Sequence, residues 1–313
     1  MTDPATSLLS RQTEPEMMTL LRAMSVCHSR AQRLDNLRMI LSILLGVAGA
    51  AVALTGVSST LVTALGALWA LMNAVGLGTW SRGQLSRGAV LQEMFDVRLF
   101  GLPWNAVAAG AEVSAAEVSR LDRAYRGDER YLRDYYEVPP LPTPYDVLAC
   151  QQQNLGWGAR VRRRYAYVVL GGTAAWSLLG VVFGISAGLT VLQLLLQWYV
   201  PSLGALLLGM EIYRSQRDVA NDRERALAVM QERITAAVER HGVDASAELL
   251  ALARQVQDLI FRSRQRQSRV PDWFFRRFHA ADRHDFQVAM AALTRILQDA
   301  RLVAPAPREG PVT

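Results

Sequence analysis

The sequence contains no lysine and only two cysteines, Cys27 and Cys150, in 313 residues. All 34 basic side chains are therefore arginine, a bias for which the nucleotide composition of the genome is a sufficient explanation. The two cysteines lie far apart, and no Cys/His cluster has the spacing of zinc ligands. The sequence therefore excludes a disulfide-rich scaffold and a zinc-finger type of domain.

The motifs of common enzyme classes are also absent. The chain has no glycine-rich phosphate loop, no nucleophile elbow and no HExxH motif. Of its four histidines, His279 and His284 lie near Asp282 and Asp285 and could meet a metal, but a solvated connector between helices is the favoured explanation. We therefore expect no enzymatic activity, no cofactor and no metal site.

The net charge of +6 is modest, because 28 acidic residues are interleaved with the arginines. This pattern does not produce a uniformly basic face, so we expect no DNA or RNA partner.

Formal charge is missing altogether from two long apolar blocks, residues 39–80 and 165–210. A helix needs about 20 residues to cross the hydrocarbon core of a bilayer, so each block holds two spans. We place the four spans at 39–57, 61–80, 165–188 and 189–210. Thirty-eight mostly polar residues precede the first span, which does not fit a secretory signal.

The arginines indicate the orientation of the spans. Five precede the first span, twelve lie between the second and third, seventeen follow the fourth, and none lies in a hairpin turn. By the positive-inside rule, the N-terminus, the central region and the C-terminus are all cytoplasmic. The lipid bilayer is thus the first expected partner, and the bacterial inner membrane the expected location.

No segment alternates as a strand, so we predict an all-α fold: a polytopic membrane protein with two transmembrane hairpins and a helical cytosolic domain. Four prolines at 139–144 forbid a helix there and favour an extended connector. The predicted segments are an N-terminal cytosolic helix (1–38), hairpin 1 (39–80), a central cytosolic helical region (81–164), hairpin 2 (165–210) and a C-terminal cytosolic helical region with a flexible tail (211–313).

Polar residues inside the spans are the main functional candidates. Stepped by three or four, Gln193, Gln197 and Glu211 fall near one face of the fourth span, and Asn73 occupies the second. Intramembrane polar groups mark either a helix contact or a water-filled pathway, and both alternatives stay open here. A four-helix bundle fills its own centre, so a pore lined by these four residues requires a homo-oligomer. Gly180, Gly184 and Gly188, spaced by four, predict a helix-packing ridge on the third span.

Two stretches, 154–165 and 261–278, combine arginine with aromatic residues. Guanidinium groups suit phosphates and aromatic faces suit bases, so both stretches could bind a nucleotide signal. For the arginine triplet, which lies at the predicted membrane edge, binding of anionic lipid is the favoured alternative, and the second stretch could equally be an interfacial or docking helix. The signal-binding candidates are Asn154, Trp157, Arg162, Arg163, Arg164 and Trp273.

The same stretches carry a family resemblance. RQTEPEMMTLLRAMSVCHSRAQRLD (11–35), QEMFDVRLFGLPWN (92–105), YDVLACQQQNLGWGARVRRRY (145–165) and VPDWFFRRF (270–278) resemble the recurring blocks of the SMODS-associated four-transmembrane effectors, pore-forming proteins of bacterial anti-phage systems of the CBASS type. The resemblance implies a membrane-disrupting effector that arrests or kills the infected cell. It also implies a trigger, a cyclic oligonucleotide made by a neighbouring nucleotidyltransferase. The alternative is a non-conducting membrane scaffold or regulatory subunit.

Overall fold

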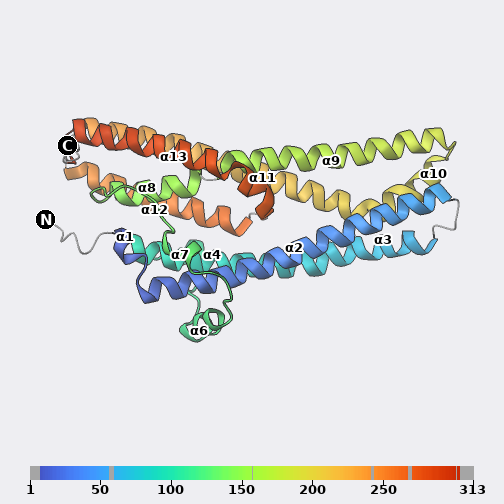
Figure 1. Ribbon diagram of the computed structural model, residues 1–313, viewed down its shortest axis with the longest axis horizontal. Helices are drawn as coiled ribbons and strands as arrows, with labels where there is room; N and C mark the ends of the chain where they lie inside the picture. Colours follow the sequence, from blue (N-terminus) through green and yellow to red (C-terminus); the bar gives the residue numbers. More distant parts are fainter. Residues whose placement is uncertain are drawn as a thin grey trace, which may run out of the picture.

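The computed structural model describes residues 8–55, 60–156, 158–240, 243–266, 270–300 and 302–303. Within these residues every regular element is helical, and four helices are long and apolar enough to cross a membrane. The predicted all-α class with four spans in two hairpins is thereby confirmed. Figure 1 shows a long molecule with the tips of both hairpins at one end and the shorter helices gathered at the other.

Hairpin 1 begins with α2 (Pro15–Thr55), which runs without a break from the body into the first span. Its second arm is α3 (Thr60–Met72), which passes through a π-helical turn, η2 (Asn73–Leu77), into α4 (Gly78–Phe100). The second span is therefore continuous with the helix of the body that follows it. That helix ends at Gly101, which has φ 67° and donates its N–H to the Val97 carbonyl.

Hairpin 2 repeats this construction. Its first arm is α9 (Ala159–Ser186), and its second arm is α10 (Val191–Leu194), a π-helical turn, η3 (Leu195–Tyr199), and α11 (Val200–Arg240). The second arm of each hairpin thus carries one wide turn and continues into the body. α2, α4 and α11 each continue across a predicted boundary between a span and a cytosolic segment. The five-segment division of the chain therefore remains a prediction.

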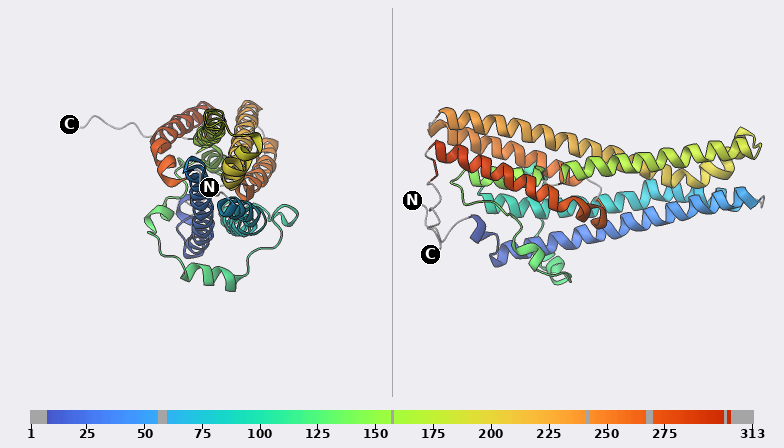
Figure 2. Two further views of the ribbon diagram at one scale, coloured as in Figure 1. Left: turned by 90° about the vertical axis from the view of Figure 1, so that its right-hand side faces the viewer. Right: turned by 45° about the horizontal axis from the view of Figure 1, so that its top comes forward.

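The other helices form the body. They are α1 (Leu8–Arg11), α5 (Ala106–Ala109), α6 (Ala115–Arg123), α7 (Arg130–Arg133), α8 (Tyr145–Gly156), α12 (Val243–Arg266) and α13 (Asp272–Asp299). The Ser114 hydroxyl caps α6, since it accepts a hydrogen bond of 3.3 Å from the Glu117 N–H. It packs on α2, beside the main bundle (Figure 2).

The two halves of the molecule bury different surfaces. The body has a continuous apolar core in which Leu21, Phe95, Leu148 and Met230 are fully buried. The spans instead leave large apolar side chains exposed, from Leu37 to Trp80 in hairpin 1 and from Tyr167 to Leu207 in hairpin 2. Soluble proteins rarely expose so large a contiguous apolar surface, whereas lipid covers it in a multi-pass membrane protein.

The hairpins meet at glycine contacts around Pro201. A Cβ atom added to Gly66 would lie 2.5 Å from the Pro201 Cα, and one added to Gly49 would lie 2.4 Å from the Pro201 Cβ. Close approach at small residues is how helices associate in lipid, where the hydrophobic effect gives no driving force between them. The start of α11 is therefore held between α2 and α3.

Two of the three glycines predicted to form a ridge on the third span pack against a helix, and the third ends α9. A Cβ on Gly180 would lie 2.5 Å from the Trp198 indole nitrogen, and one on Gly184 would lie 3.0 Å from Leu194, so both lie against the second arm of their own hairpin. Gly188 does not share this ridge. It has φ 64° and ends α9, with the Leu189 N–H bonded to the Gly184 carbonyl at 2.9 Å. The left-handed conformation, rather than packing, is what requires glycine there.

A substitution pair tests the glycine contact. We expect Gly66→Ala to lower the free energy of unfolding in detergent by about 1–3 kcal/mol, because the added methyl meets the Pro201 backbone. Gly76→Ala in the same arm is the control, since nothing lies within 4 Å of its added Cβ. Thermal unfolding followed by circular dichroism measures both, and equal stability of the two variants would contradict the contact.

Candidate functional site

A buried arginine joins the two hairpins where the spans meet the body. The Arg38 guanidinium donates to the Asn73 amide oxygen at 2.6 Å, to Asp35 at 3.1 Å and to Glu211 at 3.1 Å. Asp35 also accepts a 2.7 Å hydrogen bond from Ser81. Arg38 is 5% exposed. One guanidinium thus connects α2, the wide turn η2 and α11, and we call these five residues the Arg38 cluster.

The Arg38 cluster accounts for two predicted pore-lining residues. Asn73 is buried and Glu211 is about half exposed, and both are bonded to Arg38. Their side chains therefore connect helices in this structure and line no channel. The sequence offered one signal for the pairing: Arg38 directly precedes the first uncharged block and Glu211 directly follows the second.

The two glutamines lie in different environments. The exposed Gln193 side chain caps α10: its amide oxygen accepts from the Thr190 N–H at 2.9 Å, while the Thr190 hydroxyl accepts from the Gln193 N–H at 3.3 Å. Gln197 lies in η3 and is half-buried, and its amide forms no hydrogen bond with any described residue. The wide turn breaks the 3.6-residue periodicity, so the predicted face from Gln193 through Gln197 to Glu211 does not form.

Most other polar groups of the spans have partners inside the chain. Thr63 donates to the Leu196 carbonyl at 2.7 Å, between the hairpins. The indole N–H groups of Trp69 and Trp176 donate to Ser42 at 2.8 Å and to Ser202 at 2.9 Å. Two neighbouring residues of η3 differ, because neither the Gln197 amide nor the buried Trp198 indole N–H has such a bond to a described residue.

The arginine triplet occupies the body end of α9, and its members point to different partners. Arg162 donates to Gln216 at 2.9 Å, and Arg163 pairs with Glu224 at 2.5 Å. The Arg164 guanidinium lies over the Phe278 ring, 4.6 Å from its centroid. Arg162 and Arg163 thus hold α9 against α11, while Arg164 holds it against α13.

The other signal-binding candidates divide into two places. Trp273 is 65% exposed at the start of α13, next to Phe274, whose ring packs on Tyr165 at 5.2 Å. The structure therefore brings the two arginine and aromatic stretches together, with Trp273 and Arg164 on the outside. Asn154 lies apart and donates to the Tyr136 hydroxyl at 2.5 Å. Trp157 lies outside the described residues.

Sequence reasoning missed a buried ion network in the body. Asp96 is fully buried and accepts from Arg264 at 2.6 Å, from Tyr136 at 2.6 Å and from Gln257 at 2.9 Å. Gln257 also donates to Glu93 at 2.8 Å. These five residues, called the Asp96 network below, tie α4 to α12 and to the connector before α8.

The charges of the Asp96 network stabilise one another. Burial opposes the charge on Arg264, yet Asp96 beside it raises the pKa of that guanidinium above its ordinary value. Burial also raises the pKa of Tyr136 well above the ordinary value for a phenol, and the Asp96 charge raises it further. Tyr136 therefore stays protonated and keeps donating to Asp96 throughout the physiological range.

Two of the sequence blocks that carry the family resemblance, 92–105 and 145–165, contact α12 beside the Asp96 network. Asn105 donates to Asp258 at 2.9 Å, and Gln151 donates to the Ala253 carbonyl at 2.7 Å. The amides and acids of these blocks thus meet along α12. Among the described residues, no group of three or more His, Cys, Asp or Glu side chains could hold a metal ion.

Comparison with known proteins finds similar sequences over most of the chain. Residues 6–293 match the SMODS-associating 4TM effector domain. A Bacillus cereus (strain VD146) protein named "Probable CBASS effector molecule" is 26% identical over 278 residues, which cover 86% of this chain and 92% of that protein. No solved structure matches the chain.

The buried pair between Asp96 and Arg264 can be tested by removing its positive partner. We expect Arg264→Met to lower the free energy of unfolding by about 3–5 kcal/mol, because it leaves a carboxylate buried without its counter-ion. Arg240→Met is the control, because the Arg240–Glu248 pair is about half exposed on both sides and should be worth about 0–1 kcal/mol. Urea unfolding in micelles gives both values, and similar losses would contradict a special role for the network.

Proposed function

We propose that the chain, which belongs to the SMODS-associating 4TM effector family, is a non-enzymatic effector of bacterial anti-phage defence that permeabilises the inner membrane. In this proposal a cyclic oligonucleotide or a related infection signal switches it on, and loss of the membrane gradient arrests or kills the cell. The observation that carries the mechanism is the continuity of three spans with the body, through α2, α4 and α11. A displacement of α4 or α11 in the body is transmitted directly to the membrane.

The two wide turns support such a transmission. η2 and η3 lie within the spans of the second arms of the two hairpins. Mid-helix departures from α-helical geometry often mark hinges. The Arg38 cluster lies where the spans meet the body, and it holds η2 and α11 to α2. In the resting state it keeps the hairpins together. An activating signal would release it, because a ligand shifts a conformational equilibrium by its differential affinity for the two states.

We place the signal site on the body side of α9 and α13. Arg162, Arg163 and Arg164 supply positive charge there, and Trp273 supplies an exposed aromatic face for a base. A ligand that competes with Glu224 for Arg163 would loosen α9 from α11. Asn154 would act from inside the body, through its bond to Tyr136.

The pore itself is proposed to form between copies of the chain. Most polar groups of the spans are bonded within one chain, so we place the water-filled path where several copies meet. Gln197 is the first candidate for the lining, because its amide lacks a partner, and Gln193 lies at the far mouth. Asn73 and Glu211 would join the lining only after the Arg38 cluster opens. Both termini are cytoplasmic in this account, as the arginine distribution predicts.

Dye release from liposomes tests the function. Purified protein reconstituted with trapped fluorescent dye should release it only when cyclic oligonucleotides are added. Glu211→Gln should raise release without ligand, because the Arg38 cluster then loses one of its carboxylates. Asp218→Asn on the same helix is the control, since it removes an exposed carboxylate paired only with its neighbour Arg217.

The alternative, a non-conducting scaffold, gives a different outcome. No release under any cyclic oligonucleotide, by protein that remains folded, would favour the scaffold over the pore. Equal release by Glu211→Gln and Asp218→Asn would separate the Arg38 cluster from gating, while leaving pore formation itself intact.

A further inference from the structure

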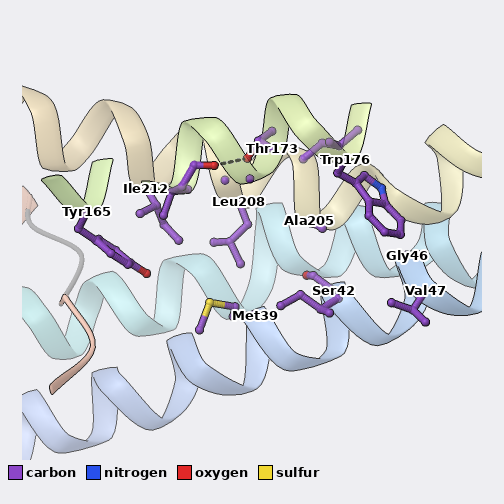
Figure 3. A pocket seen from close by; sticks show the side chains of 15 residues that line it. Met39, Ser42, Gly46, Val47, Tyr165, Thr173, Trp176, Ala205, Leu208 and Ile212 are labelled. Atoms are coloured by element: carbon purple, nitrogen blue, oxygen red, sulfur yellow. Dashed lines mark hydrogen bonds between the residues drawn. The ribbon is translucent and has the colours of Figure 1, made fainter. Parts of the chain in front are cut away.

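An apolar cavity of about 290 Å³ separates the two hairpins within the membrane-spanning half of the molecule. Its walls come from α2, α9 and α11, and Figure 3 shows the lining side chains converging from these three helices. On one side it is bounded by Ile43 and Val47, both about half exposed, so the cavity borders the surface that lipid covers.

The polar groups of the lining show what the cavity can hold. The Ser42 hydroxyl accepts from Trp69, and the Thr173 hydroxyl donates to the Val169 carbonyl at 2.9 Å, so both are occupied. The Tyr165 hydroxyl differs. Tyr165 is 6% exposed, and no described residue hydrogen-bonds to its hydroxyl, which is directed toward the other lining residues (Figure 3). The cavity is thus hydrocarbon-like along its length, with one donor at the end next to the body.

Charge lies at that same end. Arg164 directly precedes Tyr165 along the chain, and Arg214 follows Ile212 of the lining by two residues; both arginines are exposed. An apolar cleft with a hydroxyl and then positive charge at the membrane edge matches the order of groups in a phospholipid: acyl chain, ester and phosphate.

We propose that this cavity binds one acyl chain of an anionic phospholipid from the leaflet on the side of the body. The chain lies between α2 and α9, the Tyr165 hydroxyl donates to the glycerol ester, and the phosphate faces Arg164 and Arg214. The lipid fills the space between the hairpins that the protein leaves open. This inference depends on membrane insertion, and not on pore formation or on the nature of the signal.

Native mass spectrometry of delipidated protein returned to micelles with phosphatidylglycerol tests the proposal. The wild type should retain one phospholipid. Gly172→Leu should lower the retained fraction about tenfold or more, because its side chain enters the cavity from a position where nothing lies within 4 Å of an added Cβ. Gly171→Leu is the matched control, equally unobstructed on the same helix but outside the lining, and should retain the lipid.

Two further pairs of variants distinguish loss of lipid binding from a folding defect. Val47→Trp should block the mouth while Leu44→Trp, exposed on α2 but outside the lining, should not. Tyr165→Phe should weaken retention several-fold relative to Tyr167→Phe. Equal lipid retention by Gly172→Leu and Gly171→Leu would overturn the proposal. So would a lipid-free dimer in which the interface between the two copies covers the cavity. Equal retention in the tyrosine pair would overturn the hydroxyl contact.

Discussion

Inside hydrocarbon, a polar group that has no protein partner has no water as an alternative, and this constraint shapes the membrane half of the molecule. Arg38 is the sharpest case. An arginine costs about 2.5–3.5 kcal/mol at the bilayer centre, and its place at the edge of the spans, with three oxygen partners, reduces that cost. The indole-to-hydroxyl bonds of Trp69 and Trp176 follow the same rule.

Close helix contacts hold the two hairpins together near their tips. Glycines let Pro201 approach α2 and α3 closely, so little room for water is left between the hairpins there. In the proposed mechanism, opening requires polar groups to exchange partners, which a body rigidly continuous with α4 and α11 would drive. The Asp96 network gives the body that rigidity, because its buried charges are stable only in one arrangement.

The spans could be predicted from the sequence because the absence of charge over 40 or so residues has one physical explanation, a hydrocarbon environment. The positions of single residues were harder. Gln193 and Gln197 were assigned to one face on the assumption of regular helical periodicity, which the wide turn η3 removes. Gly188 fits the four-residue spacing of Gly180 and Gly184, yet its left-handed backbone ends the helix.

Contacts between distant segments within the body could not be predicted from the sequence. Asp96 and Arg264 are 168 residues apart, and nothing in the local spacing of either one indicates the other. Arg264 belongs to a stretch rich in arginine and aromatic residues, a composition that suggested an exposed binding surface. The Arg264 side chain is instead buried. The triplet Arg162 to Arg164 lies at the body end of α9, but its division between α11 and α13 depends on tertiary packing.

The central claim is that both hairpins cross the bilayer and leave the whole body on the cytoplasmic side. Cysteine labelling tests it with little background, because Cys27 and Cys150 are fully buried. A membrane-impermeant maleimide applied to intact spheroplasts should label Thr190→Cys, at the tip of hairpin 2, and should label Arg126→Cys, in the body, only after lysis. Labelling of Arg126→Cys in intact spheroplasts, or protection of Thr190→Cys until lysis, would contradict the account.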